Sequence, residues 1–74
     1  MLRKVKDFFE LEYTSTVRYL NSSYAKGNER MVVEKSISRC LGVAQFVQGI
    51  GVTYEEVDPV YNHYKKLFEL LLDR

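Results

Sequence analysis

The fold is decided at residues 49–57, which read GIGVTYEEV. The glycines at 49 and 51 end one helical pattern, because glycine disfavours a helix interior and readily adopts the left-handed backbone that follows a helix. Thr53 and Glu56 then form the S/T-x-x-E pattern of a capping box, with Val52 and Val57 as a hydrophobic staple. A second helix is therefore predicted directly after Thr53, and so short a connection predicts an antiparallel helix pair.

Downstream of this start, apolar residues recur at steps of three and four, which predicts a helix over residues 54–73. Pro59 leaves two alternatives, because an interior proline loses one backbone hydrogen bond and clashes with the preceding turn. The helix is either kinked at Pro59, or it is broken there, with Asp58 as N-cap and Pro59 as the first helical residue. The predicted seam consists of Tyr54, Val57, Tyr61, Tyr64, Phe68 and Leu71.

Upstream, a second helical pattern covers residues 29–48, and Asn28 is its predicted N-cap. Its apolar seam alternates steps of four and three, and this helix carries the small residues Cys40, Gly42 and Ala44. Since the partner seam is aromatic, we expect large side chains to pack against small ones, with Cys40 near Tyr61. The apolar seam of the helix over residues 29–48 consists of Val33, Ile37, Cys40, Ala44 and Val47.

The first helix is predicted over residues 2–25. It could end at Asn21, or it could continue to Lys26 with Gly27 as its left-handed C-terminal residue. The longer version is favoured because Tyr24 keeps the apolar stripe in phase. Together the three segments predict an all-α, up-down-up three-helix bundle, a single helical domain over residues 1–74. The apolar stripe of the first helix consists of Leu2, Val5, Phe9, Tyr13, Val17, Leu20 and Tyr24.

Composition excludes several classes of protein. The 74 residues carry 11 Lys and Arg against 10 Asp and Glu, a net charge of +1, which argues against a globally basic nucleic-acid binder. One cysteine cannot form an intramolecular disulfide, so a bridged secreted scaffold is excluded. The sequence shows neither a secretory signal nor an apolar run long enough to span a membrane. We therefore expect a cytoplasmic protein without membrane association.

Catalytic and metal-binding patterns are also missing, so neither an enzyme nor a metal or cofactor site is expected. His63 is the only imidazole, and no carboxylate lies three or four residues from it, as a helical metal site would require. Cys40 falls in the apolar seam, where a base is not expected to activate it. The glycines at 49 and 51 lack the lysine of a phosphate-binding loop.

The apolar residues that lie off the helix seams favour a function in protein–protein interaction. On the first helix Phe8, Leu11 and Tyr19 form a second stripe, rotated away from the main one. Phe46 and Leu70 likewise lie off the seams of their helices. Because Tyr and Phe are enriched in interface cores, these five residues are the predicted interface of an assembly module, most simply a homodimer. The alternative is that Phe8 and Tyr19 merely widen the buried face.

A weak nucleic-acid-binding or regulatory role is the second hypothesis. It would use Arg30, Lys35 and Arg39, which form a modest basic stripe along the second helix. A solvated helix face is the favoured interpretation of the same residues. A helix-turn-helix is disfavoured, because the helix after Thr53 opens with acidic residues that phosphates would repel.

Overall fold

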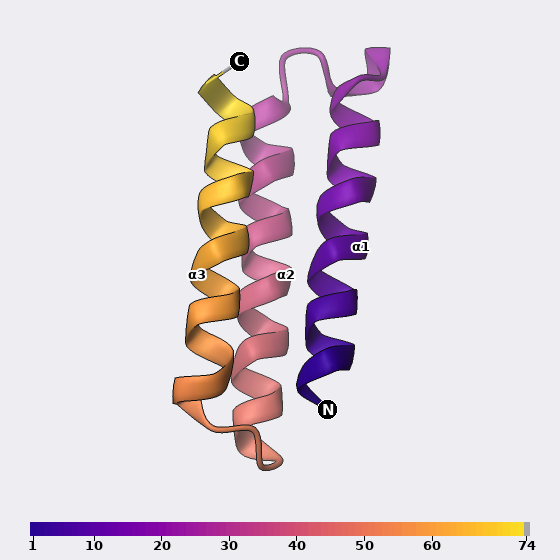
Figure 1. Ribbon diagram of the computed structural model, residues 1–74. Coiled ribbons are helices and arrows are strands. Elements are labelled where there is room, and N and C mark those ends of the chain that lie inside the picture. The colour runs from indigo at the N-terminus through magenta and orange to yellow at the C-terminus, as the bar shows by residue number, and fades with distance from the viewer. Residues whose placement is uncertain (74) are drawn as a thin grey trace.

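In the computed structural model, which describes residues 1–73, three helices pack against one another in every pair. They are α1 (Leu2–Leu20), α2 (Glu29–Gly49) and α3 (Tyr54–Leu70), and α2 runs antiparallel to the other two (Figure 1). No strand occurs within these residues. The predicted all-α three-helix bundle is confirmed, as an elongated body of 40 × 17 × 15 Å.

The connection between α2 and α3 forms as its sequence predicts. The Glu56 backbone N–H donates to Thr53 Oγ1, and the Thr53 N–H donates to Glu56 Oε1, each over 3.3 Å. The two staple residues, Val52 and Val57, are both buried. Gly51 has a φ of 118°, a left-handed backbone that side chains other than hydrogen strain. The turn therefore fixes both the end of α2 and the start of α3.

Pro59 lies inside α3, which begins at Tyr54, so the alternative of a helix that starts at Pro59 is wrong. The capping box satisfies the first turn, and proline forfeits only one backbone hydrogen bond one turn later. The predicted helix over residues 54–73 is α-helical as far as Leu70, and Leu71–Asp73 form a 3-10 turn.

The prediction that the first helix runs to residue 25 is also wrong, because α1 ends at Leu20. The backbone N–H and the Oγ of Ser22 both donate to the Tyr19 carbonyl, over 2.9 and 2.5 Å, which replaces the next helical bond. Ser23–Ala25 then form a 3-10 turn, and Tyr24 is 79% exposed rather than part of the stripe.

The start of α2 differs in one detail from its prediction. Asn28 occupies the N-cap position, but its side chain makes no capping hydrogen bond. Instead the Glu29 carboxylate accepts from the backbone N–H of Gly27 over 3.2 Å. Gly27 has a φ of 86°, so the loop, rather than the end of α1, uses its left-handed backbone.

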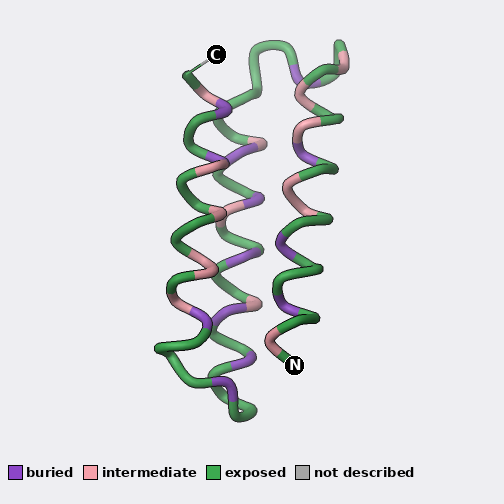
Figure 2. The backbone as a smooth tube through the Cα atoms, viewed as in Figure 1, coloured by how far each residue is buried: buried purple, intermediate pink, exposed green. Residues whose placement is uncertain are grey.

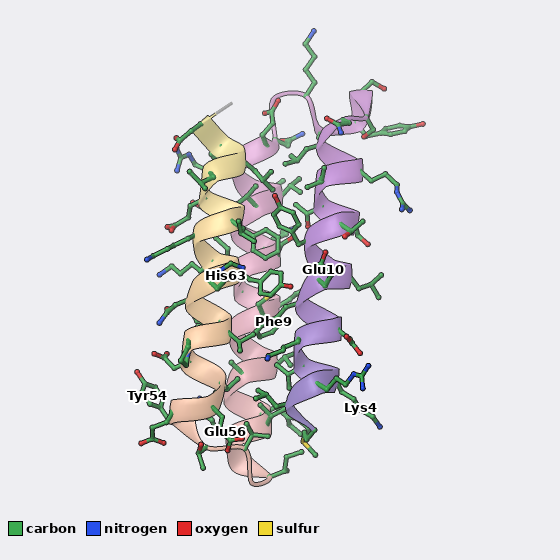
Figure 3. The ribbon with its side chains drawn as sticks, in the orientation of Figure 1. Lys4, Phe9, Glu10, Tyr54, Glu56 and His63 are labelled. Atoms are coloured by element: carbon green, nitrogen blue, oxygen red, sulfur yellow. The ribbon has the colours of Figure 1, made fainter. Side chains whose placement is uncertain are left out.

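The core runs along the facing sides of all three helices (Figure 2). Aromatic rings join α1 to α3 edge-on, Phe9 with Tyr64 at 5.7 Å and Tyr13 with Phe68 at 5.4 Å between centroids. Tyr61 and Tyr64 pack against the group of buried residues that contains Cys40, as expected from the small-to-large seam. Tyr54 is the exception. It is 59% exposed and projects from the first turn of α3, at the end of the bundle (Figure 3).

Candidate functional site

A shallow groove of about 380 Å³ lies between α1 and α2, and α3 contributes nothing to it. It therefore opens on the side of the bundle that α3 leaves uncovered. Three side chains of the predicted interface and basic stripe lie on its walls: Tyr19, Lys35 and Arg39. The lining residues are Glu12, Ser15, Thr16 and Tyr19 of α1 and Met31, Val32, Lys35, Ser36 and Arg39 of α2.

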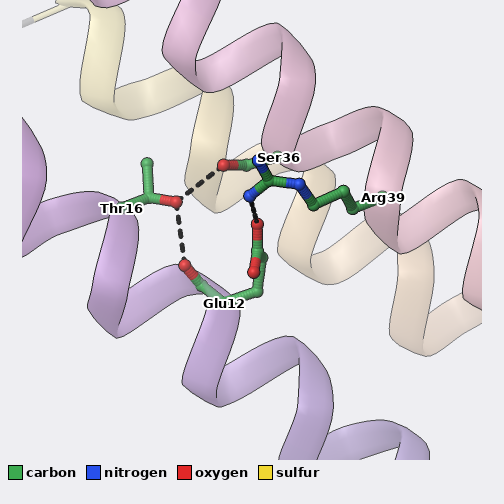
Figure 4. Close-up of polar contacts among 4 residues, drawn as sticks. All are labelled: Glu12, Thr16, Ser36 and Arg39. Atoms are coloured by element: carbon green, nitrogen blue, oxygen red, sulfur yellow. Dashed lines mark hydrogen bonds and ion pairs between the residues drawn. The ribbon is translucent and has the colours of Figure 1, made fainter.

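The floor of the groove is a buried pair of hydroxyl groups, Thr16 and Ser36, 2.7 Å apart (Figure 4). Thr16 Oγ1 also donates to the Glu12 carbonyl over 2.8 Å. A hydroxyl carries one proton, so Ser36 must be the donor in its bond to Thr16. Both hydroxyl protons are therefore used within the protein, and the pair offers no free donor to a ligand in the groove.

Above this floor an ion pair joins the two helices. Arg39 Nη1 lies 2.6 Å from Glu12 Oε1, with the arginine side chain 62% exposed and the glutamate 14% exposed. An ion pair with so exposed a partner contributes little to stability. The ion pair has a larger effect on the charge of the surface. With Arg39 paired, Lys35 is the cation of the groove that forms no ion pair among the described residues.

Exposed aromatic residues continue this face beyond the groove. Phe8 lies seven residues before Ser15, and Phe46 lies seven residues after Arg39. Seven residues are two helical turns, so each ring lies on the same side of its helix as the groove. Since α1 and α2 are antiparallel, both rings lie toward the same end of the bundle. We call the surface formed by the groove and these extensions the α1–α2 face.

Four of the five predicted interface residues lie on the α1–α2 face. Leu11 is 67% exposed and Phe46 is 66% exposed. Phe8 is 36% exposed and lies edge-on to the buried ring of Phe9, and Tyr19 is 45% exposed. Leu70 is exposed but belongs to α3, which does not line the groove. Met31 adds an exposed apolar side chain to the groove wall, and Met1 and Ile50 are exposed just beyond the ends of α1 and α2.

The three residues of the basic stripe do not form one patch. Arg39 is paired with Glu12, and Lys35 lies beside it in the α1–α2 groove. Arg30 lines a different groove of about 520 Å³, together with Leu20 and the C-terminal leucines 71 and 72. The structure therefore divides the basic stripe between two grooves.

The side chains with potential for chemistry are separated. Burial, followed by the charge of Glu12, raises the pKa of the Cys40 thiol to about 12, the opposite of an activated nucleophile. His63 is exposed and lines a third groove, of about 300 Å³, with Lys6 and Pro59 (Figure 3). Within residues 1–73 no three His, Cys, Asp or Glu residues are grouped so that they could hold a metal ion.

One further polar contact joins α1 to α3. Tyr64 Oη donates to Glu10 Oε2 over 2.6 Å. This hydrogen bond, together with burial and the charge of Glu10, raises the pKa of Tyr64 to about 12. The phenol therefore stays protonated at neutral pH and fixes the rotation of α1 against α3.

Sequence reasoning did not single out Glu12, Thr16 and Ser36. A signal was present, because Ser36 lies three residues after Val33 and four before Cys40, in phase with the core. A hydroxyl at a core position predicts a partner on the facing helix, since buried polar groups are hydrogen-bonded. The partner itself required the register between α1 and α2.

No protein family, curated protein or solved structure matches this chain. Among residues 1–73, none of the helices combines the length and the apolar character needed to cross a bilayer.

Proposed function

We propose that the protein is a non-enzymatic interaction module that acts as a homodimer through the α1–α2 face. The observation that carries this proposal is the gathering of five exposed large apolar side chains on that one face: Phe8, Leu11, Tyr19, Met31 and Phe46. Scattered exposed apolar residues are normal, whereas a contiguous apolar patch on a small protein marks a contact surface.

The size of the face supports a second copy as the occupant. Helices of 19 and 21 residues give a face about 30 Å long and two helix diameters, about 20 Å, wide. A standard interface buries about 800 Å² per partner, which a corrugated surface of that footprint can supply. The solvent-accessible surface of the chain is 5215 Å², which is roughly a tenth more than the ~4,700 Å² expected for a monomer of 8.7 kDa.

Symmetry and stability support the same occupant. Two-fold homodimers are the commonest soluble oligomers, and a chain of this length gains stability when it buries more apolar surface. The one cysteine is a buried free thiol, which suits a reducing compartment, so we place the module in the cytoplasm.

Sedimentation velocity over a concentration series tests the proposal. The wild type is expected to sediment as a dimer at high micromolar concentration. The double variant Phe8→Glu with Tyr19→Glu is expected to sediment as a monomer, because four charges would be buried in each dimer without partners. Leu70→Glu is the matched control, since it makes the same change at an exposed residue of α3.

Circular dichroism of each variant verifies that the helices remain folded. A wild-type monomer throughout the series would refute the proposal. Dissociation by Leu70→Glu together with an unaffected double variant would also refute it, because the contact would then lie on α3.

A further inference from the structure

The α1–α2 face carries an oxidisable sulfur atom. Three residues of the chain contain sulfur: Met1, Met31 and Cys40. Cys40 is 1% exposed, and burial raises the pKa of its thiol to about 12, so it presents no thiolate to an oxidant. Met31 is 49% exposed on the wall of the groove, and its thioether reacts without ionising. A peroxide in solution therefore reaches the sulfur of Met31 and not that of Cys40.

Oxidation changes what Met31 offers to a covering surface. The thioether is apolar and only a weak acceptor, whereas methionine sulfoxide is polar and carries an exposed oxygen. Tyr19 and Val32 line the groove with Met31, so a second copy on this face would bury the side chain of Met31 beside them. Burial of a polar group without a hydrogen bond is costly. The oxidised groove wall therefore disfavours a contact that the reduced wall favours.

We infer that Met31 is a modification site through which hydrogen peroxide controls assembly: oxidation of its thioether to the sulfoxide dissociates the dimer. The sulfur attacks one peroxide oxygen, the O–O bond breaks and the S–O bond forms. The leaving hydroxide takes the proton of the transferred oxygen and departs as water, so sulfur loses the two electrons that peroxide gains. This inference rests on the proposed homodimer, because the sulfoxide acts by weakening the contact through the α1–α2 face.

The dimer itself limits the reaction. A second copy on the α1–α2 face would cover Met31, so peroxide reaches this residue in the monomer and the oxidised chain is retained as a monomer. The rate of Met31 oxidation should therefore fall as the protein concentration rises. Met1 is 62% exposed, precedes the first residue of α1 and does not line the groove, so its rate of oxidation should stay constant and serve as the reference.

Peroxide treatment followed by sedimentation velocity tests the inference, and mass spectrometry of peptides measures oxidation at each methionine. The oxidised wild type should have a dimer dissociation constant at least about tenfold higher than the untreated protein, because it buries a polar group without a partner. Methionine sulfoxide reductases for both sulfoxide epimers should restore the dimer.

Met31→Leu is the matched control, because it removes the sulfur and keeps the apolar volume. Its dimer should survive peroxide, although Met1 is still oxidised. Met31→Gln places a polar group at the same position without oxidant, and it should dimerise as weakly as the oxidised wild type. Circular dichroism separates loss of the contact from loss of the fold, and oxidised wild type that had lost its helices would overturn the inference.

The remaining outcomes separate this inference from the proposed function. An unchanged dissociation constant after complete oxidation of Met31 would overturn the inference and leave the proposed function standing. Dissociation of Met31→Leu by peroxide would also overturn it, because Met1 or Cys40 would then be responsible. A wild type that is monomeric throughout the concentration series before any peroxide is added would overturn both.

Discussion

Removing the hydroxyl of Thr16 should destabilise the protein more than removing the hydroxyl of Ser36. The two groups touch each other in the floor of the α1–α2 groove, yet their roles differ. The Thr16 hydroxyl donates to the Glu12 carbonyl, whereas the Ser36 hydroxyl donates to Thr16 Oγ1. Thr16→Val preserves the side-chain shape but leaves the Ser36 proton without its partner. Ser36→Ala leaves no donor unpaired.

The magnitudes follow from this asymmetry. Ser36 is 2% exposed, so water cannot replace its lost acceptor. A buried unpaired hydroxyl costs ~1–3 kcal/mol, and the lower half of that range applies because a helical serine can turn toward the carbonyl of residue 32. Ser36→Ala should cost about 0.5–1 kcal/mol, the ordinary net value of one hydrogen bond. The double variant leaves no group unpaired, so its cost should be smaller than the sum by about 1 kcal/mol.

Urea unfolding followed by circular dichroism measures the four members of this cycle. The measurement belongs in the Phe8→Glu with Tyr19→Glu background, because dimerisation would make the apparent stability depend on concentration. Equal costs for the two single variants would refute the assigned donor. Additive costs would refute the coupling between Thr16 and Ser36.

Three further predictions concern the helices and the titratable groups. Thr53→Ala should lower the free energy of unfolding by about 1 kcal/mol through loss of the N-cap, and an unchanged urea midpoint would contradict this. Gly42→Ala should raise it by up to about 1 kcal/mol in the monomeric background, because the new methyl group meets nothing, and a loss of stability would contradict this. Tyr64 should ionise near pH 12, so its contribution to stability is complete below pH 10 and is lost as the pH rises toward 12. Phenolate absorbance of wild type and Tyr64→Phe checks this, and a Tyr64 that titrates with ordinary tyrosines would contradict it.

Local signals explain which parts of the fold were predictable. The capping box at Thr53 and Glu56 and the left-handed glycine at position 51 act within a few residues, so the sequence predicts them directly. The end of α1 depends on which group donates to the Tyr19 carbonyl, the next helical N–H or the Ser22 side chain. The spacing of apolar residues does not predict which of these two donors the carbonyl accepts. Tyr24 and Tyr54 keep the phase of their stripes but lie at the ends of the bundle, where few neighbours cover them.

The candidate site was predictable one helix at a time. Periodicity identified Phe8, Leu11 and Tyr19 on the first helix and a basic stripe on the second. It could not show that these two surfaces adjoin, because that depends on how α1 and α2 are rotated toward each other. Thr16 and Ser36 fix this rotation, and their pairing became visible only in the structure.

Intermolecular contacts in solution show directly whether two copies meet through the α1–α2 face. A mixture of isotope-labelled and unlabelled protein at high micromolar concentration permits an isotope-filtered nuclear Overhauser experiment. A dimer through the α1–α2 face should give cross-peaks between the two copies that involve the rings of Phe8 and Phe46 and the methyl groups of Leu11. Cross-peaks confined to α3 residues such as Leu70, or no cross-peaks between copies, would contradict it.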